Sequence, residues 1–130
     1  MCALRRVLVV DDHPHIRSML ETLLVLEGFD VRSAAHGQAA LELLPRFPPC
    51  LILLDLMMPV LNGWDFVPAY RHNRVADARI VIMSAGGDVQ RHAATLQVHG
   101  HLAKPFDLDT VVQVADQHVQ AHRPISITSQ

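Results

Sequence analysis

Short runs of apolar residues recur along the chain, and polar residues close the strongest of them. The runs at residues 7–10, 51–54 and 80–83 are apolar throughout, which is typical of parallel strands buried on both faces of a sheet. Residues 29–33 alternate between apolar and polar side chains, as an edge strand does, and residues 100–103 form a short fifth run. We therefore predict five strands, with the three apolar runs in the centre of the sheet.

Apolar residues between these runs are spaced as in amphipathic helices. Pro14 suits the first turn of a helix, where its missing N–H costs nothing, and Gly28 is a typical residue to end that helix. Its apolar stripe runs from Ile16 to Leu26. Four more helices are predicted, at residues 37–44, through residues 64–70, at about residues 88–98 and from Asp107 onward.

Two details of these helices concern individual side chains. Pro68 falls inside the third helical pattern, and proline is tolerated there only in the first turn. The pattern therefore leaves the start of this helix open. The last helix is expected to bury Leu108, Val111, Val112, Ala115 and Val119.

Strands and helices alternate five times along the chain, which argues for a parallel sheet with helices on both faces. Placing the apolar runs in the centre and the other two at the edges gives the order 2-1-3-4-5. This is a flavodoxin-like, doubly wound α/β fold with a five-stranded parallel sheet and five helices. A chain of 130 residues suffices for one domain but not comfortably for two. We expect one domain over residues 1–123 and a short polar tail over 124–130, with no output domain.

The composition restricts the classes of partner and the location. The formal net charge is −2, which gives no electrostatic case for nucleic acid as the main partner. No apolar stretch is long enough to span a membrane, and the first residues lead into a strand-like run rather than a signal peptide. Cys2 and Cys50 form neither a metal-ligand pattern nor a disulfide framework. We therefore expect a cytoplasmic protein that binds neither nucleic acid nor membrane.

Polar residues with complementary chemistry follow the predicted strands directly. In a parallel sheet all strands point the same way, so these residues should gather at one edge of the sheet. Each of them alone is commonplace, as a turn, a strand end or a surface lysine, but each lies immediately after an apolar run. They are Asp11, Asp12, Asp55, Ser84 and Lys104.

The chemistry of this set suits a hard cation and a phosphoryl group. Three neighbouring carboxylates repel one another unless a cation or protons intervene, and Mg²⁺ prefers oxygen ligands and water. Lys104 adds a positive charge and Ser84 a hydroxyl donor, both able to hold phosphoryl oxygens. Phosphoryl transfer is catalysed largely by positioning and charge neutralisation, and a carboxylate such as Asp55 can be the nucleophile that forms an aspartyl phosphate.

Five short motifs occur in order along the chain: Val-Asp-Asp at 10–12, Asp-Leu-Met-Met-Pro at 55–59, Asn-Gly at 62–63, Ser-Ala at 84–85 and Lys-Pro-Phe at 104–106. Any one of them is weak, but all five in this order are specific. With them the chain resembles the response-regulator receiver domains of two-component signalling, from Val7 to about His122. The resemblance implies a stand-alone, phosphorylation-dependent signalling switch. It implies no enzyme beyond a receiver that catalyses its own phosphoryl transfer and dephosphorylation.

The resemblance also implies a role for the acidic residues. Asp55 would accept the phosphoryl group from a phosphohistidine on a sensor histidine kinase or a histidine phosphotransfer protein. Mg²⁺ would be held by Asp12, Asp55 and the main-chain carbonyl of Met57, with Asp11 acting through water.

Three further residues, Ser84, Lys104 and His101, would complete the switch. Ser84 and Lys104 would hold the phosphoryl oxygens, and the peptide bond between Lys104 and Pro105 would be cis. In the family the phosphoryl group draws the strand-end hydroxyl inward, and an aromatic residue three positions before the lysine follows; here that position is His101 rather than Tyr or Phe. The signal would pass to a separate effector protein through the last strand and the last two helices. The protein would be a monomer or a phosphorylation-promoted dimer.

Two further positions depart from the usual pattern of the family. The residues two after Asp55 and two after Ser84 usually tune the loss of the phosphoryl group, and here they are Met57 and Gly86. Neither side chain can orient an attacking water, which should slow hydrolysis, while Gly86 leaves the site open, which should speed it. We expect a long-lived phosphoryl group.

Other classes of protein fit the sequence less well. A flavodoxin-type redox module needs a hydroxyl- and glycine-rich phosphate loop after the first strand, but residues 11–14 are acidic there. A haloacid-dehalogenase-like phosphatase resembles Asp-x-Asp at the nucleophile, whereas Leu56 and Met57 follow Asp55. The third alternative is a receiver-like scaffold that is never phosphorylated, against which the intact set of strand-end residues argues.

The nine histidines of the chain raise the question of a transition-metal site. His118 and His122 are four residues apart on one helical face, and His13 and His15 flank Pro14. No third ligand is evident for either pair, so a dedicated transition-metal site is not expected.

Overall fold

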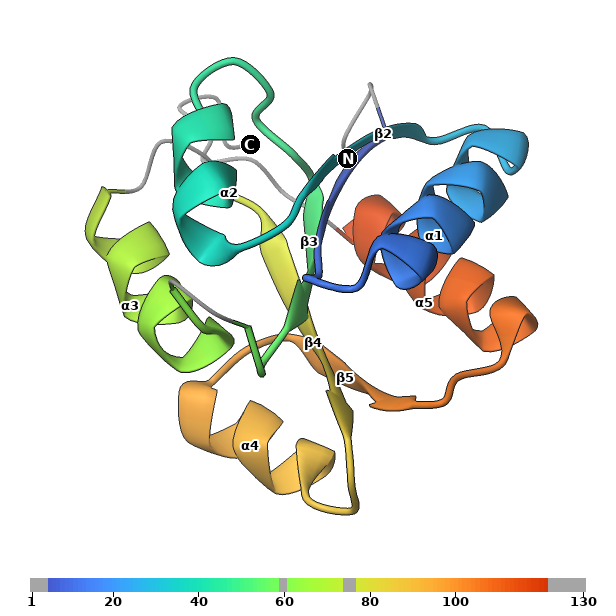
Figure 1. Ribbon diagram of the computed structural model, residues 1–130. Helices are drawn as coiled ribbons and strands as arrows, with labels where there is room; N and C mark the ends of the chain where they lie inside the picture. Colours follow the sequence, from blue (N-terminus) through green and yellow to red (C-terminus); the bar gives the residue numbers. More distant parts are fainter. Residues whose placement is uncertain (1–4, 59–60, 74–76, 122–130) are drawn as a thin grey trace, which may run out of the picture.

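The computed structural model describes residues 5–58, 61–73 and 77–121, in which five strands alternate with five helices (Figure 1). The strands are β1 (Arg6–Val10), β2 (Asp30–Ala34), β3 (Leu51–Asp55), β4 (Arg79–Ala85) and β5 (Gly100–Lys104). The helices are α1 (Pro14–Leu26), α2 (Gly37–Leu43), α3 (Gly63–Asn73), α4 (Val89–Leu96) and α5 (Leu108–Ala121). The predicted alternation of strands and helices is confirmed.

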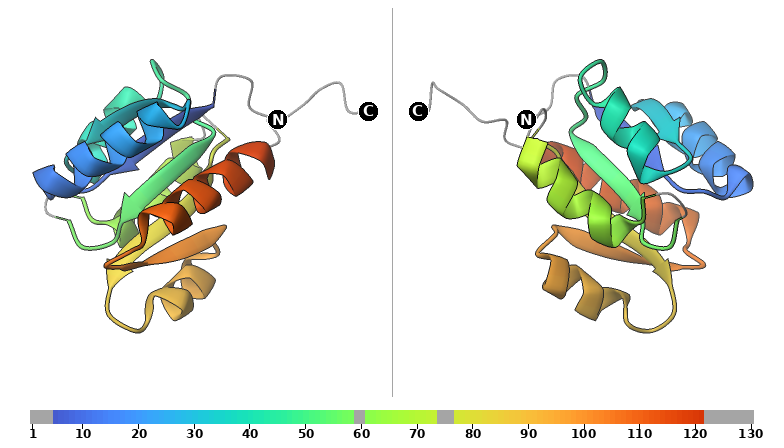
Figure 2. Two further views of the ribbon diagram at one scale, coloured as in Figure 1. Left: turned by 90° about the vertical axis from the view of Figure 1, so that its right-hand side faces the viewer. Right: turned by 60° about the vertical axis from the view of Figure 1, so that its left-hand side comes forward.

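All five strands are parallel and form one sheet in the order β2-β1-β3-β4-β5. The three runs predicted to be central are central, and the two predicted edge strands lie at the edges. Helices α1 and α5 cover one face of the sheet, and α2, α3 and α4 cover the other (Figure 1, Figure 2). The predicted doubly wound α/β fold is therefore confirmed.

Alternate residues of β3 contribute to two separate cores. Ile52 and Leu54 pack in the core beneath α2, α3 and α4, whereas Leu51 and Leu53 pack in the core beneath α1 and α5. All five residues of the strand are buried, which is why residues 51–54 are apolar throughout rather than alternating. A strand held on both faces in this way fixes the position of Asp55 at its end.

Helix α3 begins at Gly63 and includes the predicted stretch from Trp64 to Tyr70. Asn62 caps it, because its side-chain oxygen accepts a 3.0 Å hydrogen bond from the main-chain N–H of Asp65 and its carbonyl accepts one of 2.8 Å from Phe66. Pro68 is therefore the sixth residue of the helix and lies beyond its first turn. Since proline has no N–H, it cannot donate to the carbonyl of Trp64 one turn before it.

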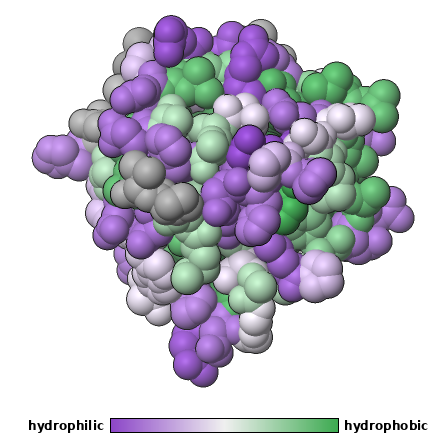
Figure 3. Space-filling view, in the orientation of Figure 1, coloured by the Kyte–Doolittle hydropathy of each residue, from purple (hydrophilic) through white to green (hydrophobic). Residues whose placement is uncertain are grey.

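Some residues of the predicted apolar helix faces are not buried. Val111, Ala115 and Val119 lie in the core as expected, whereas Val112, also expected there, is only half-buried. Leu108 of α5 is 44% exposed, and Leu26, the last residue of the α1 stripe, is 78% exposed. The reason is that both line a groove of about 480 Å³ between the two helices instead of facing the sheet. Figure 3 shows the resulting apolar surface over α1 and the start of α5, on the right-hand side of the molecule.

The remaining predictions concern the cysteines, the end of the chain and membrane-spanning helices. Cys50 is buried and disulfide-bonded, so the expectation of no disulfide is wrong for this residue. Cys2, His122 and the tail at 124–130 lie outside the described residues. Within the described part, none of the helices has the length and hydropathy to cross a membrane.

Candidate functional site

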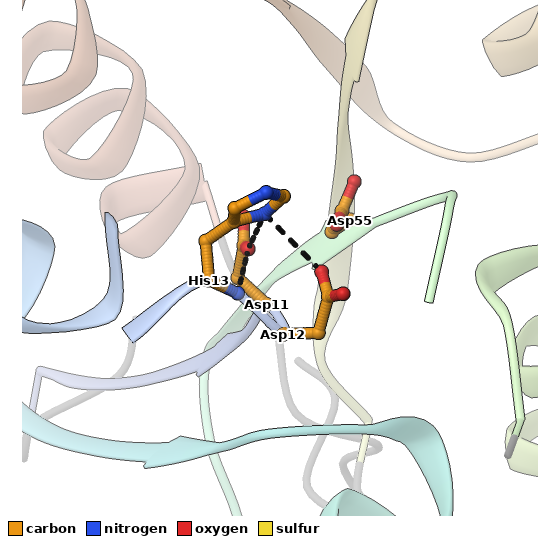
Figure 4. Close-up of side chains that lie close together, drawn as sticks. All are labelled: Asp11, Asp12, His13 and Asp55. Atoms are coloured by element: carbon orange, nitrogen blue, oxygen red, sulfur yellow. Dashed lines mark hydrogen bonds and ion pairs between the residues drawn. The ribbon is translucent and has the colours of Figure 1, made fainter. Parts of the chain in front are cut away.

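Three carboxylates meet at the carboxyl ends of β1 and β3, which are neighbours in the sheet. Asp11 and Asp12 follow β1 directly, and Asp55 is the last residue of β3. Asp11 is fully buried and Asp55 is 3% exposed, whereas Asp12 is partly exposed. One ligand atom from each of these residues and from His13 can be chosen so that all four lie within 4.8 Å of one another. Figure 4 shows the four side chains facing one another.

Lys104 brings a positive charge to the same point from the edge strand. It is the last residue of β5, and β5 pairs with β4 so that Lys104 lies opposite Ala85. Its Nζ is 2.8 Å from Asp11 Oδ2, where it donates a hydrogen bond, and 3.4 Å from Asp55 Oδ1. The peptide bond between Lys104 and Pro105 is cis. The structure thus brings the predicted lysine into contact with two of the predicted carboxylates.

The environment of Asp55 raises its pKa from 3.8 to about 6. Burial is the main cause, and the negative charge of Asp11 adds to it. The ammonium of Lys104 and a 3.3 Å hydrogen bond from the main-chain N–H of Met57 act in the opposite direction. The carboxyl is therefore mainly ionised at pH 7, and an ionised carboxylate is the form that can act as a nucleophile.

The acidic cluster has the properties of a divalent-cation site. Three carboxylates and one ammonium carry a formal charge of −2, which a divalent ion would neutralise. Asp12 Oδ1 is buried and has no hydrogen-bond partner among the described residues. His13 Nδ1 lies 3.3 Å from that oxygen without completing a hydrogen bond. A buried oxygen in need of a positive partner, among hard oxygen donors, fits Mg²⁺.

A pocket of about 280 Å³ opens above Asp55. Met57, which is 72% exposed, forms part of its wall, and His13, Ile16, Ala85 and Lys104 complete it. The carboxylate of Asp55 is therefore reachable from solvent even though the residue itself is almost fully buried.

The other predicted residues, Ser84, Gly86 and His101, form no side-chain hydrogen bond or ion pair with the carboxylates in the described part of the chain. Ser84 is buried near the end of β4, and its hydroxyl donates a 3.1 Å hydrogen bond to the carbonyl of Ala85. Gly86 has a φ of +99° and no atom near the position of a Cβ, so the site is open on this side. His101 is exposed on β5.

Sequence reasoning missed two residues that hold Asp11 in place, one directly after the strand end and one in α1. His13 donates its main-chain N–H to Asp11 Oδ1 at 2.9 Å, and Arg17 donates from Nη1 to the carbonyl of Asp11 at 2.8 Å. Together these bonds orient the buried Asp11. The position of His13, directly after two aspartates and before Pro14, is the feature of the sequence that could have indicated its role beside Asp11.

His118 is buried rather than available to a metal ion. Its Nδ1 accepts a 3.0 Å hydrogen bond from Arg79 Nε, and burial and the charge of Arg79 lower its pKa to about 4. The imidazole is therefore a neutral core residue of α5. This geometry argues against the metal site considered from the spacing of His118 and His122, of which His122 lies outside the described residues.

Comparison with protein families matches residues 7–116 to the response regulator receiver domain. Among curated proteins, the chain is 34% identical to sporulation initiation phosphotransferase F of Bacillus subtilis, over 82% of this chain and 86% of that protein. It is also 32% identical to regulatory protein AtoC of Escherichia coli, over 92% of this chain but only 26% of that protein. The chain thus spans about a quarter to less than half of the length of the first relatives that it matches.

Solved structures of the same class superimpose closely on the chain. The CheY-like receiver domain protein of Methanospirillum hungatei has a TM-score of 0.81 at 31% identity, with 91% of this chain and 96% of that chain covered. The receiver domain of a Francisella response regulator has a TM-score of 0.82 at 25% identity, over 91% and 98% of the two chains. The sheet order and the five helices are therefore those of this group of structures.

Proposed function

The chain belongs to the response-regulator receiver family of two-component signalling, and from this membership we propose that it is a switch operated by phosphorylation of Asp55. The observation that carries the proposal is the placement of Asp55. It is a buried carboxylate at a strand end, 3.4 Å from the ammonium of Lys104, beside Asp11 and beneath an open pocket. These are the parts that phosphoryl transfer to a carboxylate requires.

In the proposed reaction an ionised oxygen of Asp55 attacks the phosphorus of a phosphohistidine on the partner. The P–N bond breaks, its electron pair returns to the imidazole of the partner, and an acyl phosphate forms on Asp55. Lys104 would hold a phosphoryl oxygen because its Nζ already lies beside both carboxylates. A Mg²⁺ ion would be held by Asp12, Asp55 and the main-chain carbonyl of Met57, with Asp11 acting through water. It would supply charge neutralisation.

The surface beside the pocket suits a protein donor of the phosphoryl group. A second, apolar pocket of about 380 Å³ adjoins the first one, and both include Ile16, Ala85 and Lys104 in their walls. Its floor continues towards Met19 and Phe106, and Met19 is exposed. We propose that the histidine kinase or histidine phosphotransfer protein docks here, because apolar surface around a charged site excludes water from the reacting groups.

The output of the proposed switch depends on Ser84 and His101. The hydroxyl of Ser84 now bonds the carbonyl of Ala85, so it would have to rotate to reach a phosphoryl oxygen on Asp55. His101 is exposed on β5, the strand between α4 and α5. We propose that its inward movement changes the α4, β5 and α5 face, which a separate effector protein then recognises.

Four further parts of the proposal follow from family membership rather than from contacts. The protein acts in the cytoplasm and has no nucleic-acid or membrane partner of its own. It is a monomer or a phosphorylation-promoted dimer. It turns over no separate substrate and catalyses only the gain and loss of its own phosphoryl group. The receiver domain spans residues 1–123.

The proposal is tested by labelling with a small phosphodonor. With acetyl phosphate and Mg²⁺, intact mass and Phos-tag gels should show one added phosphoryl group, and the Asp55→Asn variant should show none. Asp109→Asn, a change to an exposed acid of α5, is the matched control and should label like the parent. Undiminished labelling of Asp55→Asn would mean that another residue is the acceptor.

A further inference from the structure

The imidazole of His13 lies beside the carboxylates of the cation site. Its Nδ1 is 3.3 Å from Asp12 Oδ1 and 3.4 Å from Asp11 Oδ1. The ring lies next to both carboxylates, on the side that also faces Asp55 (Figure 4). Asp11 Oδ1 accepts a hydrogen bond from the main-chain N–H of His13, whereas Asp12 Oδ1 is buried and has no hydrogen-bond partner in the described part of the chain.

The local backbone holds His13 in this place. The residue before a proline avoids the helical conformation, and His13 is extended, with φ −84° and ψ 114°, immediately before Pro14. Its N–H bonds Asp11 Oδ1 and its carbonyl accepts a 3.0 Å hydrogen bond from Arg17. His13 is the N-cap residue of α1, yet its side chain makes no capping hydrogen bond. The ring is therefore positioned next to the acids without a structural task in the helix.

The spacing of the four side chains suits a single bound ion. In an octahedral site with ligands at roughly 2.1 Å, neighbouring ligands are about 3 Å apart and opposite ligands about 4.2 Å apart. The distances of 3.3 and 3.4 Å from Nδ1 to the two carboxylates are close to the first value, and the 4.8 Å limit for all four atoms is close to the second. Shifts of about half an ångström would let one ion contact His13, Asp12 and Asp55, with Asp11 joined through a water molecule.

We propose that His13 supplies a nitrogen ligand to the divalent cation of this site, so that the site accepts a borderline transition-metal ion as well as Mg²⁺. Imidazole is a poor partner for Mg²⁺, which prefers oxygen, but a good one for Co²⁺ and Ni²⁺ and an acceptable one for Mn²⁺. The three carboxylates, Lys104 and a divalent ion together have no net charge. The inference rests on the proposed function only in using the same carboxylates, and it adds a residue outside them.

The direct test is pulsed electron paramagnetic resonance of bound Mn²⁺, at a pH above the ordinary histidine pKa of about 6.5. The parent protein should show coupling of Mn²⁺ to a ¹⁴N nucleus. His13→Ala and His13→Gln should lose that coupling, and His15→Ala, an exposed histidine two residues further on, should keep it. Asp12→Ala should lose it too, because the nitrogen and that carboxylate are assigned to one ion.

Displacement of Mn²⁺ by Ni²⁺ and by Mg²⁺ gives the second readout. His13→Ala should weaken Ni²⁺ binding by about tenfold or more and change Mg²⁺ binding by less than about twofold. Absence of ¹⁴N coupling in the parent, or its persistence in His13→Ala, would overturn the proposal, and so would equal losses of Ni²⁺ and Mg²⁺ affinity. Acetyl phosphate labelling of the parent with Mg²⁺ separates the two proposals. If only the assignment of His13 is wrong, the parent still labels at Asp55. If only the phosphorylation of Asp55 is wrong, the parent does not label, but bound Mn²⁺ still shows coupling to ¹⁴N.

Discussion

Lys104 donates a hydrogen bond to the fully buried carboxylate of Asp11, with 2.8 Å between Nζ and Oδ2. The lysine side chain is itself only 14% exposed. Although Asp55 lies 3.4 Å away, the shorter contact is to Asp11, so in the absence of a phosphoryl group the ammonium serves first to neutralise the acid at the end of β1. Lys104 therefore has a structural role in addition to the proposed binding of a phosphoryl oxygen.

The first prediction concerns this structural role. Lys104→Met should destabilise the protein by about 3 kcal/mol in EDTA, because it leaves a buried charge without its partner. Adding Mg²⁺ should recover part of the loss, since the ion neutralises the same carboxylates. Urea denaturation with and without Mg²⁺ measures both effects. The double variant Lys104→Met/Asp11→Asn is the control and should be more stable than the single one; a single variant as stable as the parent would contradict this account.

The second prediction follows from the raised pKa of Asp55. In the unfolded chain the carboxyl titrates near 3.8 and in the folded protein near about 6, so the folded state binds more protons between these values. Its contribution to stability is therefore present below pH 3.8 and is lost as the pH rises to about 6. Asparagine does not ionise, so Asp55→Asn avoids this loss of stability at rising pH. The variant should be more stable than the parent at pH 7, by at most about 3 kcal/mol.

Urea denaturation of the parent and Asp55→Asn in EDTA at several pH values checks this prediction. The difference in the free energy of unfolding between the two proteins should grow from pH 4 to pH 6 and stay level above it. Asp109→Asn, at an exposed position, should show no such growth. A difference independent of pH would mean that the carboxyl of Asp55 is not perturbed by folding.

Much of this fold could be predicted from the pattern of residues, for a physical reason. Residues 51–54 are apolar on both faces because β3 has a core on each side, and only a central parallel strand has that requirement. Once the strands are parallel, their carboxyl ends share an edge, so Asp11, Asp55 and Lys104 had to lie near one another. Topology alone carried this part of the interpretation.

The remaining features depend on contacts that no local pattern encodes. Leu108 is exposed because α1 and α5 leave a groove between them, which depends on how two helices pack across a sheet. The hydroxyl of Ser84 can rotate, and the structure places it on the carbonyl of Ala85. The helix start before Pro68 depends on the cap supplied by Asn62. The role of His13 depends on a side-chain direction that the sequence pattern could not supply.

The third prediction concerns the buried histidine of α5. The pKa of His118 is about 4 in the folded protein and 6.5 in the unfolded chain, so the unfolded state binds more protons between these values. Stability should therefore fall as the pH decreases from 6.5 to 4, by at most about 3 kcal/mol from this residue. His118→Gln keeps an acceptor for Arg79 and should flatten this dependence. His15→Gln, on the surface, should leave it unchanged, and an NMR titration of the His118 ring near pH 6.5 would contradict the prediction.

The fourth prediction concerns the lifetime of the phosphoryl group. The side chain of Met57 lies in the wall of the pocket above Asp55 and cannot orient a water molecule. Met57→Asn should speed the loss of the phosphoryl group severalfold, because its amide can hydrogen-bond an attacking water. Met57→Leu is the matched apolar control and should decay like the parent. Equal decay rates for Met57→Asn and the parent, followed by Phos-tag gels after removal of the donor, would argue against a role for this position.

The last prediction concerns the close contact of Gly63 with the main chain of Asp55 and Leu56. Gly63 donates its N–H to the carbonyl of Leu56 at 3.0 Å, and a Cβ at Gly63 would lie 2.9 Å from Leu56 Cα and 3.0 Å from the carbonyl oxygen of Asp55. These are main-chain atoms next to the acceptor, so they cannot move aside without moving Asp55. Gly63→Ala should therefore destabilise the protein by about 1 to 3 kcal/mol.

Gly87→Ala is the matched control, because a Cβ at Gly87 would meet no atom within 4 Å. Gly63→Ala should also label more slowly with acetyl phosphate under conditions in which it is fully folded, since its clash displaces the carbonyl of the acceptor residue itself. Urea denaturation gives the first effect and a labelling time course the second. If both alanine variants are equally stable and label at the same rate, the backbone around Asp55 is more adaptable than its close contact with Gly63 implies.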